Sequence, residues 1–121
     1  MRDHTQLIAF QKADALVFAV YHVTQQLPYD ERFGLTSQMR RAAVSVASNI
    51  VEGCTRGTEA DYVHFLGLAF SSLRELCYQL SVSFRLGYLP QTVYDPIQQQ
   101  SDECSKVLGA LIRSYRKNQK T

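Results

Sequence analysis

The feature of this chain that most constrains its fold is a helical pattern that continues from Thr58 to Leu86. Apolar residues recur along it every three or four positions, which is the spacing of one face of an α-helix. They are Tyr62, Leu66, Ala69, Leu73, Leu76 and Leu80. A rise of about 1.5 Å per residue gives this helix a length of about 42 Å. A helix of this length needs other helices to cover its apolar face.

Three further segments show the same periodicity. The four predicted helices cover residues 6–26, 36–52, 59–86 and 90–117. Short connections between long helices favour antiparallel neighbours, and no segment has the alternation of a strand. The sequence therefore predicts an all-α fold, in which residues 1–121 form a single domain. Its architecture is an antiparallel up-down-up-down four-helix bundle with a left-handed twist.

Residues with special backbone chemistry mark the ends of the first three helices. Pro28 ends the first helix. Thr36 is the expected N-cap of the second helix, which is predicted to end at Gly53. Thr58 and Asp61 form a capping pattern at the start of the third helix.

The fourth helix has two prolines near its start, and a glycine precedes it. Gly87 is placed to end the third helix, and Pro90 suits the beginning of the fourth. Pro96 lies inside the predicted fourth helix. Because proline lacks an amide hydrogen and collides with the carbonyl four residues before it, we expect a kink near Thr92 or a new start capped by Asp95.

The composition is that of an ordinary globular domain. Hydrophobic residues make up 45% of the chain, charged residues 20%, and the formal net charge is +2. The N-terminus does not read as a signal peptide, and no apolar run approaches the roughly 20 residues that span a bilayer. We therefore expect a cytoplasmic protein without membrane contact. Its three cysteines include no C-x-x-C pair and are expected to be reduced thiols: Cys54, Cys77 and Cys104.

Charge is distributed unevenly in the predicted bundle. One end combines the start of the first helix, the second connection and the end of the fourth helix. This end, the basic pole, has seven positive residues: Arg2, Lys12, Arg56, Arg113, Arg116, Lys117 and Lys120. It has four negative residues: Asp3, Glu52, Glu59 and Asp61.

The basic residues at the C-terminal end have two interpretations. Cations in the last turns of a helix complement its exposed carbonyl groups. However, the segment from Ser105 to Thr121 contains five basic residues, no acidic residue and the aromatic Tyr115, which is typical of phosphate and base contacts. We hypothesise that RNA or DNA contacts Lys12, Arg56, Arg113, Arg116, Lys117 and Lys120.

A polar stripe follows the second helix beside its apolar face. It consists of Arg41, Ser45, Asn49 and Glu52, and the candidate partners on the third helix are Arg74 and Glu75. One interpretation is structural, in which these side chains bond to one another and fix the helix register inside the bundle or at a subunit contact. The other is that they bind a ligand or nucleic acid.

The third helix has a second apolar line next to its main one. This line repeats every seven residues: Val63, Phe70, Cys77 and Phe84. A helix in a lone bundle needs an apolar arc of about 100°, so the extra width predicts an interface with another subunit. A larger core within one chain is the alternative.

Motifs that carry catalysis are missing from the sequence. We find no glycine-rich phosphate loop, nucleophile elbow or H-E-x-x-H zinc motif. A ferritin-like dimetal site needs two Glu-x-x-His motifs, and Asp61-x-x-His64 is the one spacing that comes near. We therefore expect no enzyme activity, no metal and no cofactor.

Several of these residues follow the pattern of one family. The pattern begins with Phe10-Gln11-Lys12-Ala13. It continues with Gly34, Leu35, Thr36, Gln38, Arg40, Arg41, Ala42, Ser45, Asn49, Ile50, Glu52 and Gly53, and then with Arg56, Phe65, Leu66, Ala69, Ser72, Leu73 and Glu75. On these residues the chain resembles the four-helix bundle proteins named after the intervening sequences of bacterial 23S rRNA. The resemblance spans residues 10–89 and departs at Ser71 and Cys77, where glycine and an acidic residue are expected.

The resemblance implies a bundle that assembles into a ring, most often a homopentamer, and that has no catalytic activity. Relatives include the accessory protein of diversity-generating retroelements, a basic pentameric barrel that binds nucleic acid and a reverse transcriptase. The hypothesis is therefore a non-enzymatic homo-oligomer, with a pentamer favoured, that binds RNA or DNA through its basic pole. The alternative is a protein–protein interaction scaffold that does not bind nucleic acid.

Overall fold

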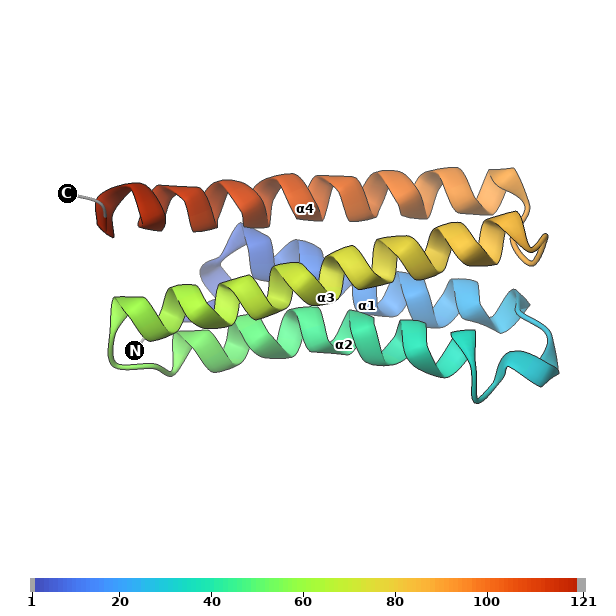
Figure 1. Cartoon of the computed structure of the whole chain (residues 1–121), viewed down its shortest axis with the longest axis horizontal. Coiled ribbons are helices and arrows are strands. Elements are labelled where there is room, and N and C mark those ends of the chain that lie inside the picture. The colour runs from blue at the N-terminus through green and yellow to red at the C-terminus, as the bar shows by residue number, and fades with distance from the viewer. Residues whose placement is uncertain (1, 120–121) are drawn as a thin grey trace.

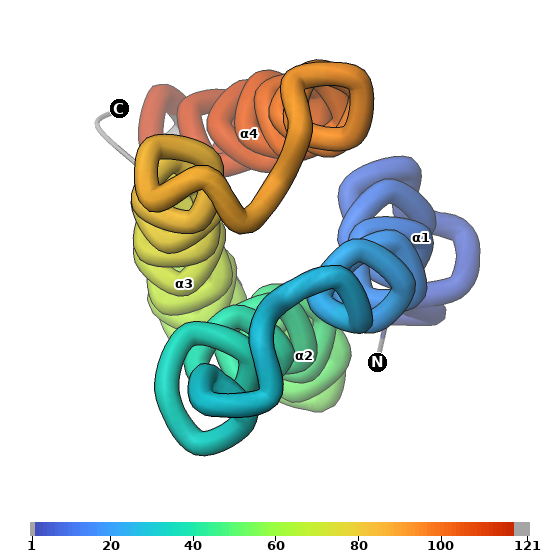
Figure 2. Tube along the Cα trace, turned by 90° about the vertical axis from the view of Figure 1, so that its right-hand side faces the viewer, coloured from blue at the N-terminus to red at the C-terminus, as the bar shows by residue number. Residues whose placement is uncertain are grey.

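The computed structural model describes residues 2–119, with side chains through Lys117. Its four α-helices are α1 (Ile8–Val23), α2 (Leu35–Cys54), α3 (Glu59–Arg85) and α4 (Gln91–Gln119). Successive helices run in opposite directions (Figure 1). Viewed end-on, they occupy the corners of a square, so that α1 and α3 each pack against α2 and α4 (Figure 2). The predicted antiparallel four-helix bundle is confirmed, and the described residues contain no strand.

The core is built from the apolar faces that the sequence spacing indicates. The main stripe of α3 is completely buried, at 0% exposed for Tyr62, Leu66, Ala69, Leu73, Leu76 and Leu80. The other helices contribute Leu16, Val20, Met39, Val46, Ile50, Cys104 and Leu108, which are also buried. Burial of these faces is the main force that holds the four helices together.

The first predicted helix is α-helical over only part of its range. Turns of 3-10 helix flank α1 at His4–Gln6 and Thr24–Gln26. The buried Thr24 hydroxyl donates a hydrogen bond to the Val20 carbonyl oxygen at 2.8 Å. This bond keeps the Thr24 side chain satisfied where the α-helix tightens into the 3-10 turn.

The N-terminal segment covers the end of the bundle. The Arg2 amide donates a hydrogen bond to the Cys54 carbonyl oxygen at 3.1 Å, and the Arg2 guanidinium lies 3.9 Å from the centroid of the Tyr62 ring. Tyr115 of α4 meets Tyr62 edge-on, with 5.2 Å between the ring centroids. Arg2 is therefore packed on aromatic rings rather than free at a basic surface.

The cap of α2 differs from the prediction. The helix begins at Leu35, and Gly34 rather than Thr36 occupies the N-cap position. The Glu31 carboxylate accepts a hydrogen bond from the Leu35 amide at 3.2 Å. A carboxylate from the preceding turn thus supplies the acceptor and the negative charge that favour a helix N-terminus.

Gly53 does not end α2, which continues through Cys54. A Cβ added at Gly53 would stand 3.0 Å from the Phe65 Cβ and 3.3 Å from the Tyr62 ring. Glycine is needed here because α2 and α3 approach each other closely, and not because the helix ends.

Both ends of α3 follow the prediction. The Thr58 hydroxyl accepts a hydrogen bond from the Asp61 amide at 3.1 Å. At the other end Gly87 has a φ of 84°, and the next amide, of Tyr88, donates to the Ser83 carbonyl oxygen at 3.0 Å. Glycine adopts this left-handed conformation without steric cost, which lets the chain turn into α4.

Pro96 is accommodated inside α4, which is a single helix from Gln91 onward. The alternative prediction, a new helix start capped by Asp95, is wrong. Pro96 and Thr92 lie in the first turns and are both exposed. Water can therefore bond to the Thr92 carbonyl that has lost its amide partner.

Candidate functional site

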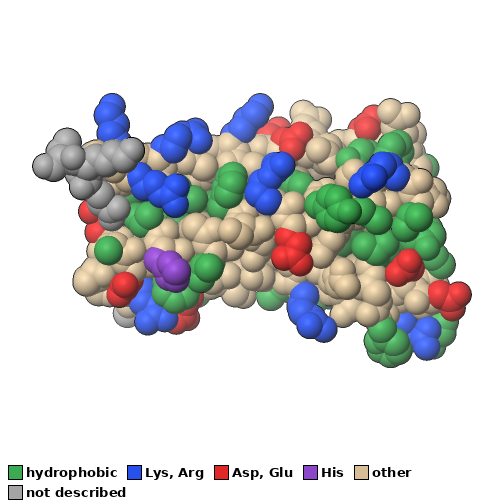
Figure 3. Space-filling view, viewed as in Figure 1, with side chains coloured by type: hydrophobic (Ala, Val, Ile, Leu, Met, Phe, Trp, Pro, Cys, Tyr) green, Lys and Arg blue, Asp and Glu red, His purple; other side chains and the backbone are tan. Residues whose placement is uncertain are grey.

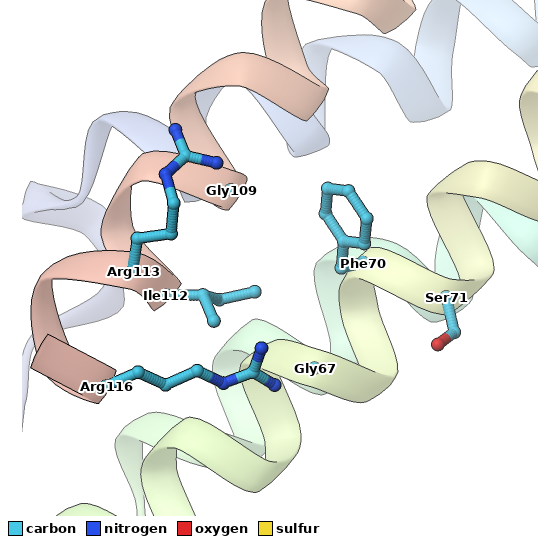
Figure 4. Close-up of a pocket in the computed structure, with 7 residues that line it drawn as sticks. All are labelled: Gly67, Phe70, Ser71, Gly109, Ile112, Arg113 and Arg116. Carbon is cyan, nitrogen blue, oxygen red and sulfur yellow. The ribbon is translucent and has the colours of Figure 1, made fainter. Parts of the chain in front are cut away.

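A groove of about 270 Å³ lies between α3 and α4, toward the C-terminal end of α4. Phe70 and Ile112 form its apolar floor, and Arg113 and Arg116 project from α4 beside it (Figure 4). Gly67, Ser71 and Gly109 complete its lining. The groove therefore combines an apolar base with two guanidinium groups.

Two glycines keep the arginine groove open. A Cβ added at Gly109 would come 3.2 Å from Arg113 Nη1, and one added at Gly67 would come 3.9 Å from Arg116 Nη2. Each guanidinium group thus lies over a helix position that has no side chain. A ligand can approach both groups without displacing a side chain at either glycine.

Neither groove arginine has an anionic partner in the described chain. The ion pairs among the described side chains join Lys12 to Glu103 and Arg56 to Glu52, and neither involves the groove. None of the lining residues is acidic. Because each guanidinium group carries a positive charge, Arg113 and Arg116 leave two positive charges uncompensated. Further Lys and Arg side chains follow the same edge of the molecule (Figure 3).

Two of the other predicted contact residues are paired with carboxylates instead. Lys12 Nζ on α1 lies 3.7 Å from Glu103 on α4. Arg56 binds Glu52 one turn before it, and its guanidinium lies 4.5 Å from the centroid of the Phe65 ring. These pairings reduce the positive charge that Lys12 and Arg56 offer to a ligand.

The remaining predicted contacts are at the C-terminal end. Lys117 is exposed near the end of α4, and Lys120 lies outside the described residues. Of the six predicted residues, the structure brings Arg113 and Arg116 together in one groove.

Part of the polar stripe links α2 to α3. The hydroxyl oxygens of Ser45 and Ser72 are 2.8 Å apart and share a hydrogen bond. Asn49 Nδ2 donates to the Ser45 carbonyl oxygen at 2.9 Å and to its hydroxyl at 3.1 Å. This half of the stripe matches the structural interpretation, since it fixes the two helices relative to each other.

The other half of the stripe faces solvent. Arg41 is exposed and forms no ion pair with a described residue, while Glu52 is bound to Arg56. Glu75 accepts a hydrogen bond from Gln79 at 3.2 Å along α3. Arg41 and Glu75 line one open depression between α2 and α3 without pairing.

The second apolar line of α3 meets α4 of the same chain at Phe70 and Phe84. Val63 and Cys77 are only 7% and 8% exposed. Phe70 packs beside Gly109, and Phe84 stacks on Tyr94 with 4.4 Å between the ring centroids. The extra width of this face therefore serves the α3–α4 contact, and Val63 and Cys77 offer little surface to another subunit.

Several titratable groups are shifted by burial. Burial raises the pKa of Tyr62 to about 12, and its hydroxyl has no hydrogen-bond partner among the described residues. Burial also raises the pKa of the Cys104 thiol to about 11, and it raises the thiol pKa values of Cys54 and Cys77. All three cysteines are unbridged and buried. Thiols in this state are poor nucleophiles and metal ligands.

The near-match to a dimetal motif stays isolated. His64 is exposed and meets the Phe65 ring edge-on at 5.6 Å, and Asp61 is exposed as well. Within residues 2–119, no three His, Cys, Asp or Glu side chains gather closely enough to hold a metal ion. Across the same residues, no helix combines the length and the apolar character that crossing a bilayer requires.

Sequence reasoning missed the two glycines of the groove. Gly67 and Gly109 both lie inside predicted helices, where glycine is unfavourable relative to alanine. The unfavourable helix propensity of glycine was therefore the one sign in the sequence that these two positions are special. Their pairing with Arg113 and Arg116 depends on how α3 and α4 cross, which spacing along one helix does not give.

These features define a small antiparallel four-helix bundle with an arginine-bearing groove between α3 and α4. The family model described as 23S rRNA-intervening sequence protein matches residues 5–110. The chain belongs to this family, which confirms the resemblance drawn from residues 10–89.

A solved structure supports the same fold. The chain is similar to a protein with unknown function from the S23 ribosomal protein family of Bacteroides thetaiotaomicron VPI-5482, with a TM-score of 0.81 and 23% sequence identity. The similarity covers 88% of this chain and 96% of that one. At this identity the likeness concerns the fold. Comparison with curated proteins gives no match.

Proposed function

We propose that the protein is a non-enzymatic binding protein for RNA or DNA, and that it contacts the phosphate backbone through the α3–α4 groove. The observation that carries this proposal is the pair Arg113 and Arg116, which share one groove and lack a carboxylate partner in the described chain. Guanidinium groups bind phosphate through charge and through two parallel N–H donors.

The groove suits backbone contact better than base reading. Arginines in an open, shallow site reach phosphate oxygens, which carry no sequence information. Its apolar floor of Phe70 and Ile112 can pack against sugar groups. We therefore expect salt-sensitive binding with little choice of sequence.

The side chains of the groove favour binding over catalysis. The guanidinium groups of Arg113 and Arg116 are hydrogen-bond donors without an acceptor atom, so they do not serve as general bases. Ser71 is the one hydroxyl in the lining, and the lining includes no His, Lys, Asp or Glu that could act as its base. Nucleophilic catalysis by serine needs such a base within reach.

The proposal is tested by measuring the affinity for a fluorescently labelled RNA duplex at low salt. Replacement of Arg113 and Arg116 by Ala should weaken binding by about tenfold or more. Arg85→Ala is the matched control, because Arg85 is an exposed arginine of α3 whose described partner is Ser81. Arg85→Ala removes one positive charge and the test variant removes two. A logarithmic loss of affinity in Arg85→Ala that is half that of the test variant would show that net charge, and not the groove, determines binding.

We also propose a homo-oligomer, for which the family resemblance favours a pentamer. In the single chain, two large apolar side chains of α3 are exposed to solvent. They are Leu68 and Tyr78. Contact between copies would cover them, and a ring would multiply weak phosphate contacts by avidity. Light scattering should give about five times the chain mass of 13.8 kDa. A monomer would remove the ring and the avidity.

The same exposed side chains favour a second candidate function, a scaffold that binds another polypeptide. Leu68 and Tyr78 would then be covered by the partner protein. Purification distinguishes the two functions. A stoichiometric protein partner together with an absorbance ratio of nucleic-acid-free protein would support the scaffold.

A further inference from the structure

A second open surface lies at the opposite end of the bundle from Arg113 and Arg116. It surrounds the connection between α1 and α2, which Figure 1 shows far from the C-terminus. Phe33 and Tyr29 in this connection are 84% and 75% exposed. Large aromatic side chains open to this degree and close together are typical of an interaction site.

Arg32 is held between these two rings. Its guanidinium carbon lies 3.8 Å from the centroid of the Tyr29 ring and 4.7 Å from that of Phe33. Arg32 Nη1 also donates a hydrogen bond to the Tyr29 carbonyl oxygen at 3.1 Å. These contacts orient the guanidinium group while its positive charge stays uncompensated.

Arg40 of α2 is oriented in a similar way. Its Nε donates to the Thr24 hydroxyl at 2.9 Å, its Nη2 donates to the Tyr21 carbonyl oxygen at 3.4 Å, and its guanidinium lies 4.7 Å from the Tyr21 ring centroid. The acceptors for two of the three guanidinium nitrogens are therefore uncharged oxygen atoms. Arg40 Nη1 has no partner in the described chain and remains available to an anion.

The carboxylates of the connection do not neutralise these arginines. Glu31 accepts hydrogen bonds from the Leu35 amide and the Tyr88 hydroxyl, so both of its oxygens are occupied. Asp30 is exposed and forms no ion pair with a described residue. A depression of about 470 Å³ beside the connection is lined without any acidic residue, and the lining includes Tyr21, Arg32, Phe33, Ser37, Arg40 and Arg41.

We propose that this aromatic–arginine surface binds single-stranded nucleic acid. Bases stack on the exposed faces of Phe33 and Tyr29, and phosphates contact Arg32, Arg40 and Arg41. Rings interleaved with cations match the alternation of bases and phosphates in an unpaired strand. An acidic polypeptide would satisfy the arginines but leave the two rings in water. The inference adds a second surface, selective for unpaired strands, to the nucleic-acid binding proposed above.

The test compares a labelled oligouridine with an RNA duplex on the purified full chain. Replacement of Phe33 and Tyr29 by Leu removes the stacking faces and should weaken oligouridine binding by at least about fivefold for each ring, with duplex binding unchanged. Phe33→Tyr keeps a ring and should retain the affinity. Phe18→Leu is the matched control, because Phe18 is 70% exposed on α1 and lies outside this depression.

The outcomes separate this inference from the proposed function. Unchanged oligouridine affinity in the Phe33 and Tyr29 variant would overturn the inference, and duplex binding that still depends on Arg113 and Arg116 would leave the proposed function standing. The opposite pattern would support this surface and remove the α3–α4 groove. Binding of polyglutamate, but not oligouridine, through Arg32 and Arg40 would assign the surface to an acidic polypeptide and overturn the inference.

Discussion

Gly53 of α2 lies so close to Phe65 of α3 that a Cβ added at Gly53 would stand 3.0 Å from the Phe65 Cβ. Atoms this near to the backbone of packed helices cannot move aside as the end of a long side chain can. We expect Gly53→Ala to lower the free energy of unfolding by about 1–3 kcal/mol, measured by urea denaturation.

Gly67→Ala is the matched control for this change. A Cβ at Gly67 would meet only the end of Arg116, at 3.9 Å, so the better helix propensity of alanine should raise the free energy of unfolding by about 0.5–1 kcal/mol. If both variants became more stable, α2 and α3 would have to lie further apart than they do here.

The hydrogen bond between Ser45 and Ser72 is expected to couple α2 to α3. Either single replacement by Ala leaves the other half-buried hydroxyl without its partner and should cost about 1 kcal/mol. The double variant should cost about as much as one single variant, because it leaves neither group unpaired. A thermal or urea double-mutant cycle measures this coupling, and simple additivity would show that the bond contributes nothing.

Tyr62 should make the fold sensitive to strong alkali. Burial raises the pKa of its phenol from 10.0 to about 12 in the folded chain. Its neutral form is therefore favoured by folding, and this stabilisation is complete below pH 10 and is lost as the pH rises toward 12.

An ultraviolet titration of tyrosinate tests this shift. The folded protein should show one tyrosine that ionises near pH 12, and the Tyr62→Phe variant should lack it. The variant should remain folded, because the Tyr62 hydroxyl has no hydrogen-bond partner in the described chain. Loss of a component that ionises near pH 10 in Tyr62→Phe, with no component near pH 12 to lose, would mean that the phenol is open to solvent.

The cysteines should be protected from thiol reagents. Cys54, Cys77 and Cys104 are buried, and burial raises the pKa of each thiol, so both access and thiolate formation are suppressed. We expect negligible labelling by a chromogenic disulfide reagent in the native protein and three reactive thiols after unfolding. Rapid labelling of the native protein would place at least one cysteine at the surface.

Features determined by neighbours along the chain could be predicted from the sequence. The Thr58 cap and the turn at Gly87 involve residues within a few positions of each other. The buried stripe of α3 follows from its period alone. The Arg56–Glu52 pair has the spacing of one helical turn and was also open to prediction.

Features that depend on how the helices meet could not be predicted in this way. The pairing of Lys12 with Glu103 and the approach of Gly53 to Phe65 join segments that only the folded bundle brings together. The sequence indicates the aromatic–arginine surface only weakly. Tyr29 and Phe33 lie in a loop segment that offers no core face to bury them, and such aromatic residues are candidates for binding.

Contact between phosphates and the pair Arg113 and Arg116 can be measured through the salt dependence of DNA duplex binding. The logarithm of the association constant falls linearly with the logarithm of the salt concentration, by about 0.9 for each phosphate contact. We expect weaker binding and a slope shallower by about 1.8 when both arginines are replaced by Ala. An affinity and a slope equal to those of the unmodified protein would contradict this expectation.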